Sequence, residues 1–201
     1  MTRYFIDLTQ PEIAAQLKKN PLVILPAGSV EQHGPHLPTG TDIYAANVIG
    51  HAVAERMDGL VLPGGPLGVT PMHMPFEGTI TLTPDTYQRV VTETCASTAQ
   101  HGAKRLLILN WHEGNIPSLA IASEKLHREV GMSVIVVQAC YVAAELYGHD
   151  CGEDCCCCLD PEENEPCDLC GGRGWVVRRV GLVDALRVPV RPAPVGRVLR
   201  A

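Results

Sequence analysis

Residues 22–33 read Leu-Val-Ile-Leu-Pro-Ala-Gly-Ser-Val-Glu-Gln-His. The first half, Leu22–Ala27, is an unbroken apolar run between Pro21 and Gly28, which predicts a strand buried on both faces. Strands of this kind are typical of parallel sheets that helices cover on both sides. We therefore expect the chain to fold around a parallel sheet that begins with this strand.

Apolar strands and helical segments alternate after this first strand. Further strands are predicted at Leu60–Leu62, Thr79–Thr83, Arg105–Leu109 and Ser133–Gln138. Helices are predicted at Ile43–Met57 with Asp42 as N-cap, from Pro84 to about Gln100, and at Asn115–Val130, which Gly131 ends. This alternation predicts the α/β class, here a three-layer α/β/α architecture with a mostly parallel sheet.

Two of the predicted strands run directly into segments that carry histidine and carboxylate groups. Glu31 and His33 follow the first strand and share a face if the backbone is extended, and Asp42 comes after a loop rich in Gly and Pro. His112 and Glu113 follow a later strand. Because ligands collect at the carboxyl ends of parallel strands, these groups are candidates for one metal site. Imidazole and carboxylate donors without thiolate favour catalytic Zn, Mn or Fe(II).

Each of these residues also has an ordinary structural explanation. A single His beside a strand is often only a hydrogen-bonded residue, and Asp42 could serve only as a helix cap. Glu-x-His is a weak pattern by itself. The combination of Glu, His, Asp and a distant His at strand ends is a stronger signal, but spacing alone leaves the metal site and the structural roles as open alternatives.

Composition and charge limit the kinds of partner. The net charge of -6 argues against nucleic acid, which usually selects a basic face. The first residues lack an apolar signal core, and no apolar run reaches the length of a membrane span. We therefore expect a cytoplasmic protein without membrane association. Its core should be aliphatic, because aromatic residues make up only 4% of the chain.

Three segments, in order along the chain, carry the residues of interest. They are Pro26-Ala-Gly-Ser-Val-Glu-Gln-His-Gly-Pro-His-Leu-Pro-Thr-Gly-Thr-Asp42, Met72-His-Met-Pro-Phe-Glu-Gly-Thr-Ile-Thr-Leu82 and Asn110-Trp-His-Glu-Gly-Asn115. Together they resemble the signatures of the creatininase (creatinine amidohydrolase) family, over residues 1 to about 145. The resemblance implies a metal-dependent amidohydrolase that cleaves a non-peptide C–N bond in a cyclic amide or a formamide. It also implies a small-molecule amide as partner and a homo-oligomer.

The resemblance further implies roles for individual residues. Glu31 and His112 would bind one divalent ion and His33 a second, with Asp42 bridging the two ions, which would be Zn²⁺, Mn²⁺ or Fe²⁺. Asn110, Glu113 and Asn115 are candidates for further metal ligands or for residues that support the ligands. Candidates for substrate contacts are His36, His73 and Trp111. Turn capping is the alternative for the two Asn residues, and a structural hydrogen bond is the alternative for His36.

Two departures from the family pattern leave the catalytic status open. Creatininase itself has a metal-binding Glu two residues after the His, where this chain has Gly114. Relatives without that Glu use a carboxylate from a later His-Ala-Gly-x-x-Glu-Thr-Ser motif, which this sequence lacks. A catalytically degenerate relative or a zinc-stapled binding protein is therefore the alternative to a working hydrolase.

The last part of the chain has a different composition. Seven of the nine cysteines lie between Cys151 and Cys170, and the residues after Arg173 are rich in Arg and Pro. We expect residues 1–148 to form a creatininase-like hydrolase domain that lacks its C-terminal part. Residues 149–201 would form a separate segment that binds structural zinc or is poorly ordered; a frameshift, a fusion or a truncated gene would also explain it. The candidate zinc ligands are Cys151, Cys155, Cys167 and Cys170.

Overall fold

A parallel sheet forms the centre of the fold. The computed structural model describes residues 2–65 and 67–142, and within them the sheet has four strands in the order β2-β1-β3-β4. All neighbouring strands pair in parallel. The predicted α/β class and its parallel sheet are thereby confirmed. The strands are β1 (Leu22–Ala27), β2 (Leu60–Val61), β3 (Arg105–Asn110) and β4 (Ser133–Gln138).

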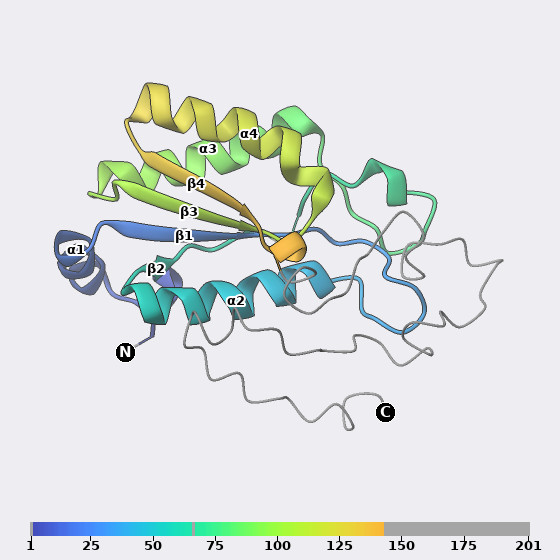
Figure 1. Cartoon of the computed structure of the whole chain (residues 1–201), viewed down its shortest axis with the longest axis horizontal. Helices are drawn as coiled ribbons and strands as arrows, with labels where there is room; N and C mark the ends of the chain where they lie inside the picture. Colours follow the sequence, from blue (N-terminus) through green and yellow to red (C-terminus); the bar gives the residue numbers. More distant parts are fainter. Residues whose placement is uncertain (1, 66, 143–201) are drawn as a thin grey trace.

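Helices cover both faces of this sheet (Figure 1). On one face lies α2 (Thr41–Met57), and on the other lie α3 (Pro84–Gln100) and α4 (Ile116–Lys125), which gives the three predicted layers. None of the helices in the described part combines the length and the apolar character that a bilayer span needs. The remaining helical elements are η1 (Phe5–Asp7), α1 (Gln10–Lys19), η2 (Pro71–His73), η3 (Glu113–Asn115) and η4 (Leu126–Val130).

Alternation along β1 divides the core into two apolar layers. Val23 and Leu25 belong to a buried cluster with side chains of α3 and α4 such as Leu119. Ile24, between them, belongs to a second cluster with Ala54 of α2. Fully burying one such aliphatic side chain stabilises the fold by about 1.5–3 kcal/mol. The strand is therefore held from both faces, as its unbroken apolar sequence predicts, and the expected aliphatic core is present.

The start of α2 differs from the prediction. The helix begins at Thr41 with Gly40 at the N-cap position, so Asp42 lies in the first turn and is not the cap. The hydroxyl of Thr41 donates to the carbonyl of Pro38 at 2.6 Å, which fixes the chain just before the helix. The carboxylate of Asp42 is therefore not used for capping and faces the carboxyl end of β1.

Two other predicted elements also differ. Residues 79–83 do not form a strand: Ile80 makes an isolated antiparallel bridge to Val30, and Thr81 makes a parallel one to Gly68. A segment that pairs with different partners at successive residues cannot continue either ladder. The helix predicted at residues 115–130 is divided into η3, α4 and the π-helical η4, which ends at Gly131 as predicted.

The strand order places a reversal in the direction of the crossover connections between the neighbouring strands β1 and β3. β1 and β3 are neighbours, but the chain leaves β1 towards α2 on one face and leaves β3 towards α4 on the other. Such a reversal is a topological switch point, and the loops diverge there at the carboxyl ends of the two strands. Glu31 follows β1 at this point, and His112 follows β3.

Candidate metal centre

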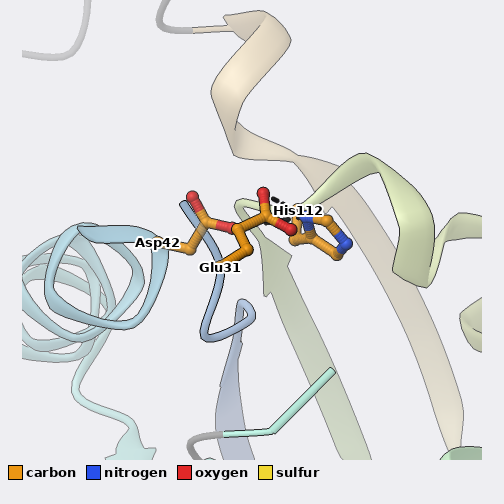
Figure 2. A group of neighbouring side chains, drawn as sticks. All are labelled: Glu31, Asp42 and His112. Carbon is orange, nitrogen blue, oxygen red and sulfur yellow. Dashed lines mark ion pairs between the residues drawn. The ribbon is translucent and has the colours of Figure 1, made fainter. Parts of the chain in front are cut away.

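Three side chains meet at the switch point between β1 and β3 (Figure 2). Glu31, Asp42 and His112 each offer a ligand atom, and these atoms all lie within 4.8 Å of one another. His112 Nδ1 is 3.1 Å from Glu31 Oε1 and 3.3 Å from Asp42 Oδ2. The three residues are only 6%, 3% and 5% exposed, so the cluster is buried although all of its members are ionisable.

Close packing of two backbone segments brings Asp42 to this point. A Cβ atom at Gly28 would come within 2.8 Å of the carbonyl carbon of Asp42, a distance that real Cβ atoms essentially never show. Glycine directly after β1 therefore lets the first turn of α2 lie against the end of the strand. This contact carries the Asp42 carboxylate next to Glu31, three residues beyond Gly28.

The ring of His112 is oriented by a backbone carbonyl. Its Nε2 lies 3.0 Å from the carbonyl oxygen of Val69, which can only accept a hydrogen bond, so Nε2 carries a proton. The other ring nitrogen, Nδ1, faces the two carboxylates. The ring therefore presents Nδ1 as the atom that could bind a metal, while the backbone holds the opposite side.

The charges of the cluster are strongly coupled. Burial by itself favours neutral Glu31 and Asp42, but hydrogen bonds from His112 outweigh it and hold the pKa of both carboxyls below their usual values. Burial also opposes a charged His112, yet hydrogen bonds to Asp42 and Glu31 raise the pKa of His112 to about 10. A divalent cation would take the place of the Nδ1 proton, because a ligating imidazole must be neutral.

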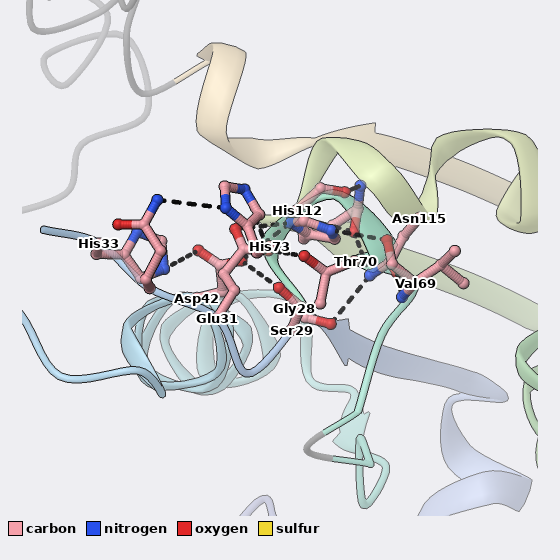
Figure 3. A network of polar contacts seen from close by, with 12 residues as sticks. Gly28, Ser29, Glu31, His33, Asp42, Val69, Thr70, His73, His112 and Asn115 are labelled. Atoms are coloured by element: carbon pink, nitrogen blue, oxygen red, sulfur yellow. Dashed lines mark hydrogen bonds and ion pairs between the residues drawn. The ribbon is translucent and has the colours of Figure 1, made fainter. Parts of the chain in front are cut away.

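His33 lies on the opposite side of Asp42 (Figure 3). Its Nε2 is 3.3 Å from Asp42 Oδ1, whereas Oδ2 of the same carboxylate faces His112. One carboxylate thus stands between two imidazoles with one oxygen turned towards each. Two buried carboxylates with two imidazoles form a donor set that suits Zn²⁺ or Mn²⁺, and buried charges of this kind are normally paired or bound to a metal.

Two hydroxyl groups hold the carboxylates, and sequence reasoning missed both. The hydroxyl of Ser29 donates to Asp42 Oδ2 at 3.1 Å, and that of Thr70 donates to Glu31 Oε2. Both residues are 0% exposed. Ser29 stands two residues before Glu31, which could have suggested its role, but an isolated Thr in a loop offers no comparable signal.

Asn110 and Asn115 fix the loops around the site. The side chain of Asn115 accepts from the backbone N–H of Val69 at 2.9 Å and donates to the carbonyl of Gly28 at 3.0 Å. Asn110 donates to the carbonyl of His112 at 2.5 Å. Both Asn residues are 0% exposed. The two amides therefore tie the end of β1, the loop at residue 69 and the end of β3 to one another.

The other candidates occupy different positions. Glu113 is exposed and hydrogen-bonds Tyr141, raising the pKa of that phenol to about 12. The ring of His36 lies over Gly34, and the backbone N–H of Trp111 donates to the carbonyl of Ala27. In the described part of the chain, the group of potential metal ligands that meet is Glu31, Asp42 and His112. The predicted zinc ligands Cys151, Cys155, Cys167 and Cys170 lie outside the described residues.

Gly114 cannot be replaced by a carboxylate in this backbone conformation. A Cβ atom there would lie 2.2 Å from the carbonyl oxygen of Val69 and 2.5 Å from His112 Nε2. Any side chain at residue 114 would thus displace the hydrogen bond that orients His112. The loop is built for glycine, so the metal-binding Glu that the family resemblance led us to look for at this place has no room here.

The chain is similar in sequence to proteins that are named as hydrolytic enzymes. A mycofactocin precursor peptide peptidase of Mycobacterium ulcerans (strain Agy99) is 37% identical over 118 residues, which cover 54% of this chain and 47% of the relative. A creatinine amidohydrolase of Pseudomonas putida is 33% identical over 115 residues, or 54% of this chain and 44% of the relative. The chain spans about half the length of the curated relatives it matches.

Solved structures of creatininases have a fold similar to that of this chain. A structure titled "Creatininase Mn" aligns with a TM-score of 0.62 and 28% identity, covering 74% of this chain and 65% of the other. A mutant creatininase complexed with creatine aligns with the same TM-score and identity, covering 74% and 64%. The family model for creatininase (creatinine amidohydrolase) matches residues 6–162. Because this match covers most of the sequence, the chain belongs to the creatininase family.

Proposed function

We propose that this chain carries the metal centre of an amidohydrolase that cleaves a C–N bond with an activated water. The observation that carries the proposal is the position of Asp42, with Oδ2 turned towards His112 and Oδ1 towards His33. Glu31, Asp42 and His112 would hold one divalent ion, and Asp42 and His33 would hold a second. When bound, such ions supply Lewis acids that polarise the scissile carbonyl and acidify the attacking water.

The chain's own residues prepare this chemistry. Thr70 and Ser29 orient the two carboxylates, and Val69 orients His112, so the donor atoms are in place before any ion arrives. Burial of the ligands keeps bulk water from competing with the substrate for the site. Zn²⁺ or Mn²⁺ is the proposed cofactor, because two matching structures are described as "Creatininase Mn" and as a mutant creatininase of "Zn-Zn type".

The proposed substrate is a small-molecule amide. A matching structure is described as a creatininase with creatine, which supports a small, polar, non-peptide ligand such as a cyclic amide or a formamide. Relatives described as mycofactocin precursor peptide peptidases support a peptide as the other substrate class. Both classes of substrate would place an amide carbonyl at the metal centre. The proposed reaction is therefore hydrolysis of an amide C–N bond in either class.

A metal-binding protein without turnover is the second candidate. It is favoured by Gly114, where no side chain can supply the carboxylate that creatininase uses. Among the described residues, the second ion would then have Asp42 and His33 as its protein ligands. A working enzyme would need a further ligand from residues beyond 142 or from another copy of the chain.

A hydrolysis screen separates the two candidates. The full chain, loaded with Mn²⁺ or Zn²⁺, is assayed against creatinine, a formamide and a short peptide. Asp42→Ala should lower turnover at least about a thousandfold, because metal activation is worth several kcal/mol and 1.4 kcal/mol is tenfold. Glu55→Ala is the control, since Glu55 is an exposed carboxylate on the same helix. Full metal loading of the wild-type chain with no turnover of any substrate would instead support the second candidate.

We also propose that the chain works as a homo-oligomer in the cytoplasm. Tyr44 and Val48 are 63% and 69% exposed and lie four residues apart on α2, so they share one face of the helix. Exposed apolar patches commonly mark interaction surfaces. Analytical ultracentrifugation of the full chain should find an assembly larger than the monomer, and a monomer at micromolar concentration would contradict this proposal.

A further inference from the structure

The segment at residues 70–73 lies against Glu31 (Figure 3). The hydroxyl of Thr70 donates a hydrogen bond to Glu31 Oε2. The short helix η2 then turns the chain so that His73 Nε2 lies 3.9 Å from the same oxygen. The side chain of His73 is 17% exposed, which places it between the buried cluster and the solvent. His73 therefore stands at the edge of the metal centre.

Gln32 determines which nitrogen of His73 carries the proton. The backbone N–H of Gly34 donates to Gln32 Oε1 at 2.8 Å, which identifies the oxygen end of that amide. The amide nitrogen of Gln32 therefore faces His73, with its Nε2 at 3.2 Å from His73 Nδ1. An amide N–H can only donate, so Nδ1 accepts, and the neutral ring carries its proton on Nε2.

His73 Nε2 faces the proposed metal centre, and among the described residues its polar contact is the long one to Glu31 Oε2. A separation of 3.9 Å from Glu31 Oε2 is longer than a hydrogen bond, and that oxygen already accepts from Thr70. A separation of 3.9 Å leaves no room for an atom between Nε2 and Oε2, but an oxygen of a bound molecule lying beside this pair could accept the proton of His73.

We propose that His73 is a hydrogen-bond donor to the substrate oxygen that gains negative charge as water adds to the amide carbonyl. Gln32 is the positioning residue that keeps the ring in the donating tautomer. The inference rests on the proposed amide hydrolysis. It also requires that His73 binds neither ion, because a metal on Nε2 would replace the proton that the ring is to donate.

Matched variants test this assignment in the zinc-loaded full chain. His73→Ala should lower kcat by about 100- to 1,000-fold, the usual effect of removing one oxyanion donor, with unchanged metal content. His73→Gln places an amide N–H near the position of Nε2 and should recover at least about tenfold of that loss. Added imidazole should partly rescue His73→Ala but not Asp42→Ala, whereas a merely structural His73 would give no rescue.

The tautomer is measured independently of any activity. Long-range ¹H–¹⁵N spectra of the zinc-loaded wild-type chain should place the His73 proton on Nε2, and Gln32→Leu should produce a mixture of both tautomers. A proton on Nδ1 in the wild-type chain, an ion lost with His73→Ala, or an unchanged kcat in that variant would each overturn the inference. If the wild-type chain hydrolyses no amide but shows the Nε2 tautomer, the proposed hydrolysis fails while the positioning by Gln32 stands.

Discussion

At the scale of single residues, the proposed metal centre depends on groups that hold its candidate ligands. Thr70 is buried and donates to Glu31 Oε2, which leaves Oε1 facing His112. The carbonyl of Val69 similarly fixes His112, and the amide of Asn115 fixes the backbone of Val69. Outer partners of this kind orient metal ligands, and their loss typically costs about 10- to 100-fold in affinity.

Replacing Thr70 by Val tests this arrangement, because Val has the same shape but no hydroxyl. We expect Thr70→Val to weaken the first bound ion by about 10- to 100-fold, as measured by calorimetric titration with Zn²⁺. Thr70→Ser keeps the hydroxyl and should bind nearly as tightly as the wild-type chain. Equal affinities for the Val and Ser variants would show that the hydroxyl does not support Glu31.

At the scale of elements, the site requires α2 to pack closely on the end of β1. The contact between Gly28 and the backbone of Asp42 leaves no space for a Cβ atom. On the far end of the same helix, Asp58 adopts a left-handed conformation with φ of 54° and ends α2. Its carboxylate binds Arg3 at 2.7 Å and Lys19 at 2.8 Å. Close backbone packing thus fixes the start of α2, and ion pairs fix its end.

Gly28→Ala should push α2 away from β1 and displace the Asp42 carboxylate. We expect a loss of about 1–3 kcal/mol in the free energy of unfolding, as for other overpacked sites, together with weaker metal binding. Gly65→Ala is the matched control, because a Cβ atom there meets no atom of the described residues within 4 Å. Chemical denaturation and metal titration measure the two effects. Similar behaviour of both variants would contradict the close packing.

Asp58, at the end of α2, makes a pH-dependent contribution to the stability of the fold. Hydrogen bonds from Lys19 and Arg3 lower the pKa of Asp58 to about 2, below an unfolded value of about 3.9. A depressed folded pKa stabilises the fold above the unfolded pKa, and this contribution is lost as the pH falls towards 2. Asp58→Asn should therefore lower Tm at neutral pH, by an amount that shrinks between about pH 4 and pH 2. A Tm difference that does not change over this range would contradict the assignment.

At the scale of the whole molecule, the sequence predicted the sheet better than the site. β1 is an unbroken apolar run and is buried along its whole length, as that pattern predicts. The apolar centre of β3 is largely buried as well, but β4 ends the described sheet and is only partly covered, with Ile135 64% exposed, so the burial predicted for residues 133–138 is wrong. The segment at residues 79–83 looked like a strand because β-branched residues alternate there, but it bridges two different segments. Asp42 looked like a helix cap because local sequence does not reveal that the helix starts at Thr41, two residues before the predicted start at Ile43.

The residues after strands were the most predictable part of the site, and Asp42, which follows a loop, was a candidate only together with them. Glu31 and His112 could be expected at one edge of the sheet because parallel strands end together. The hydrogen bonds by which Thr70, Val69 and Gln32 orient other side chains depend on a loop that folds back on that edge of the sheet. No periodic pattern in the sequence predicts such a contact. The clash at Gly114 likewise appears only when the position of Val69 is known.

Anomalous diffraction from crystals of the full chain soaked in Zn²⁺ tests the central claim most directly. The account predicts two peaks, one on each side of the Asp42 carboxylate. The first should contact Glu31, Asp42 Oδ2 and His112 Nδ1, and the second should contact Asp42 Oδ1 and His33. Peaks only at cysteine residues, or a single peak that leaves Asp42 without an ion, would contradict the two-metal centre.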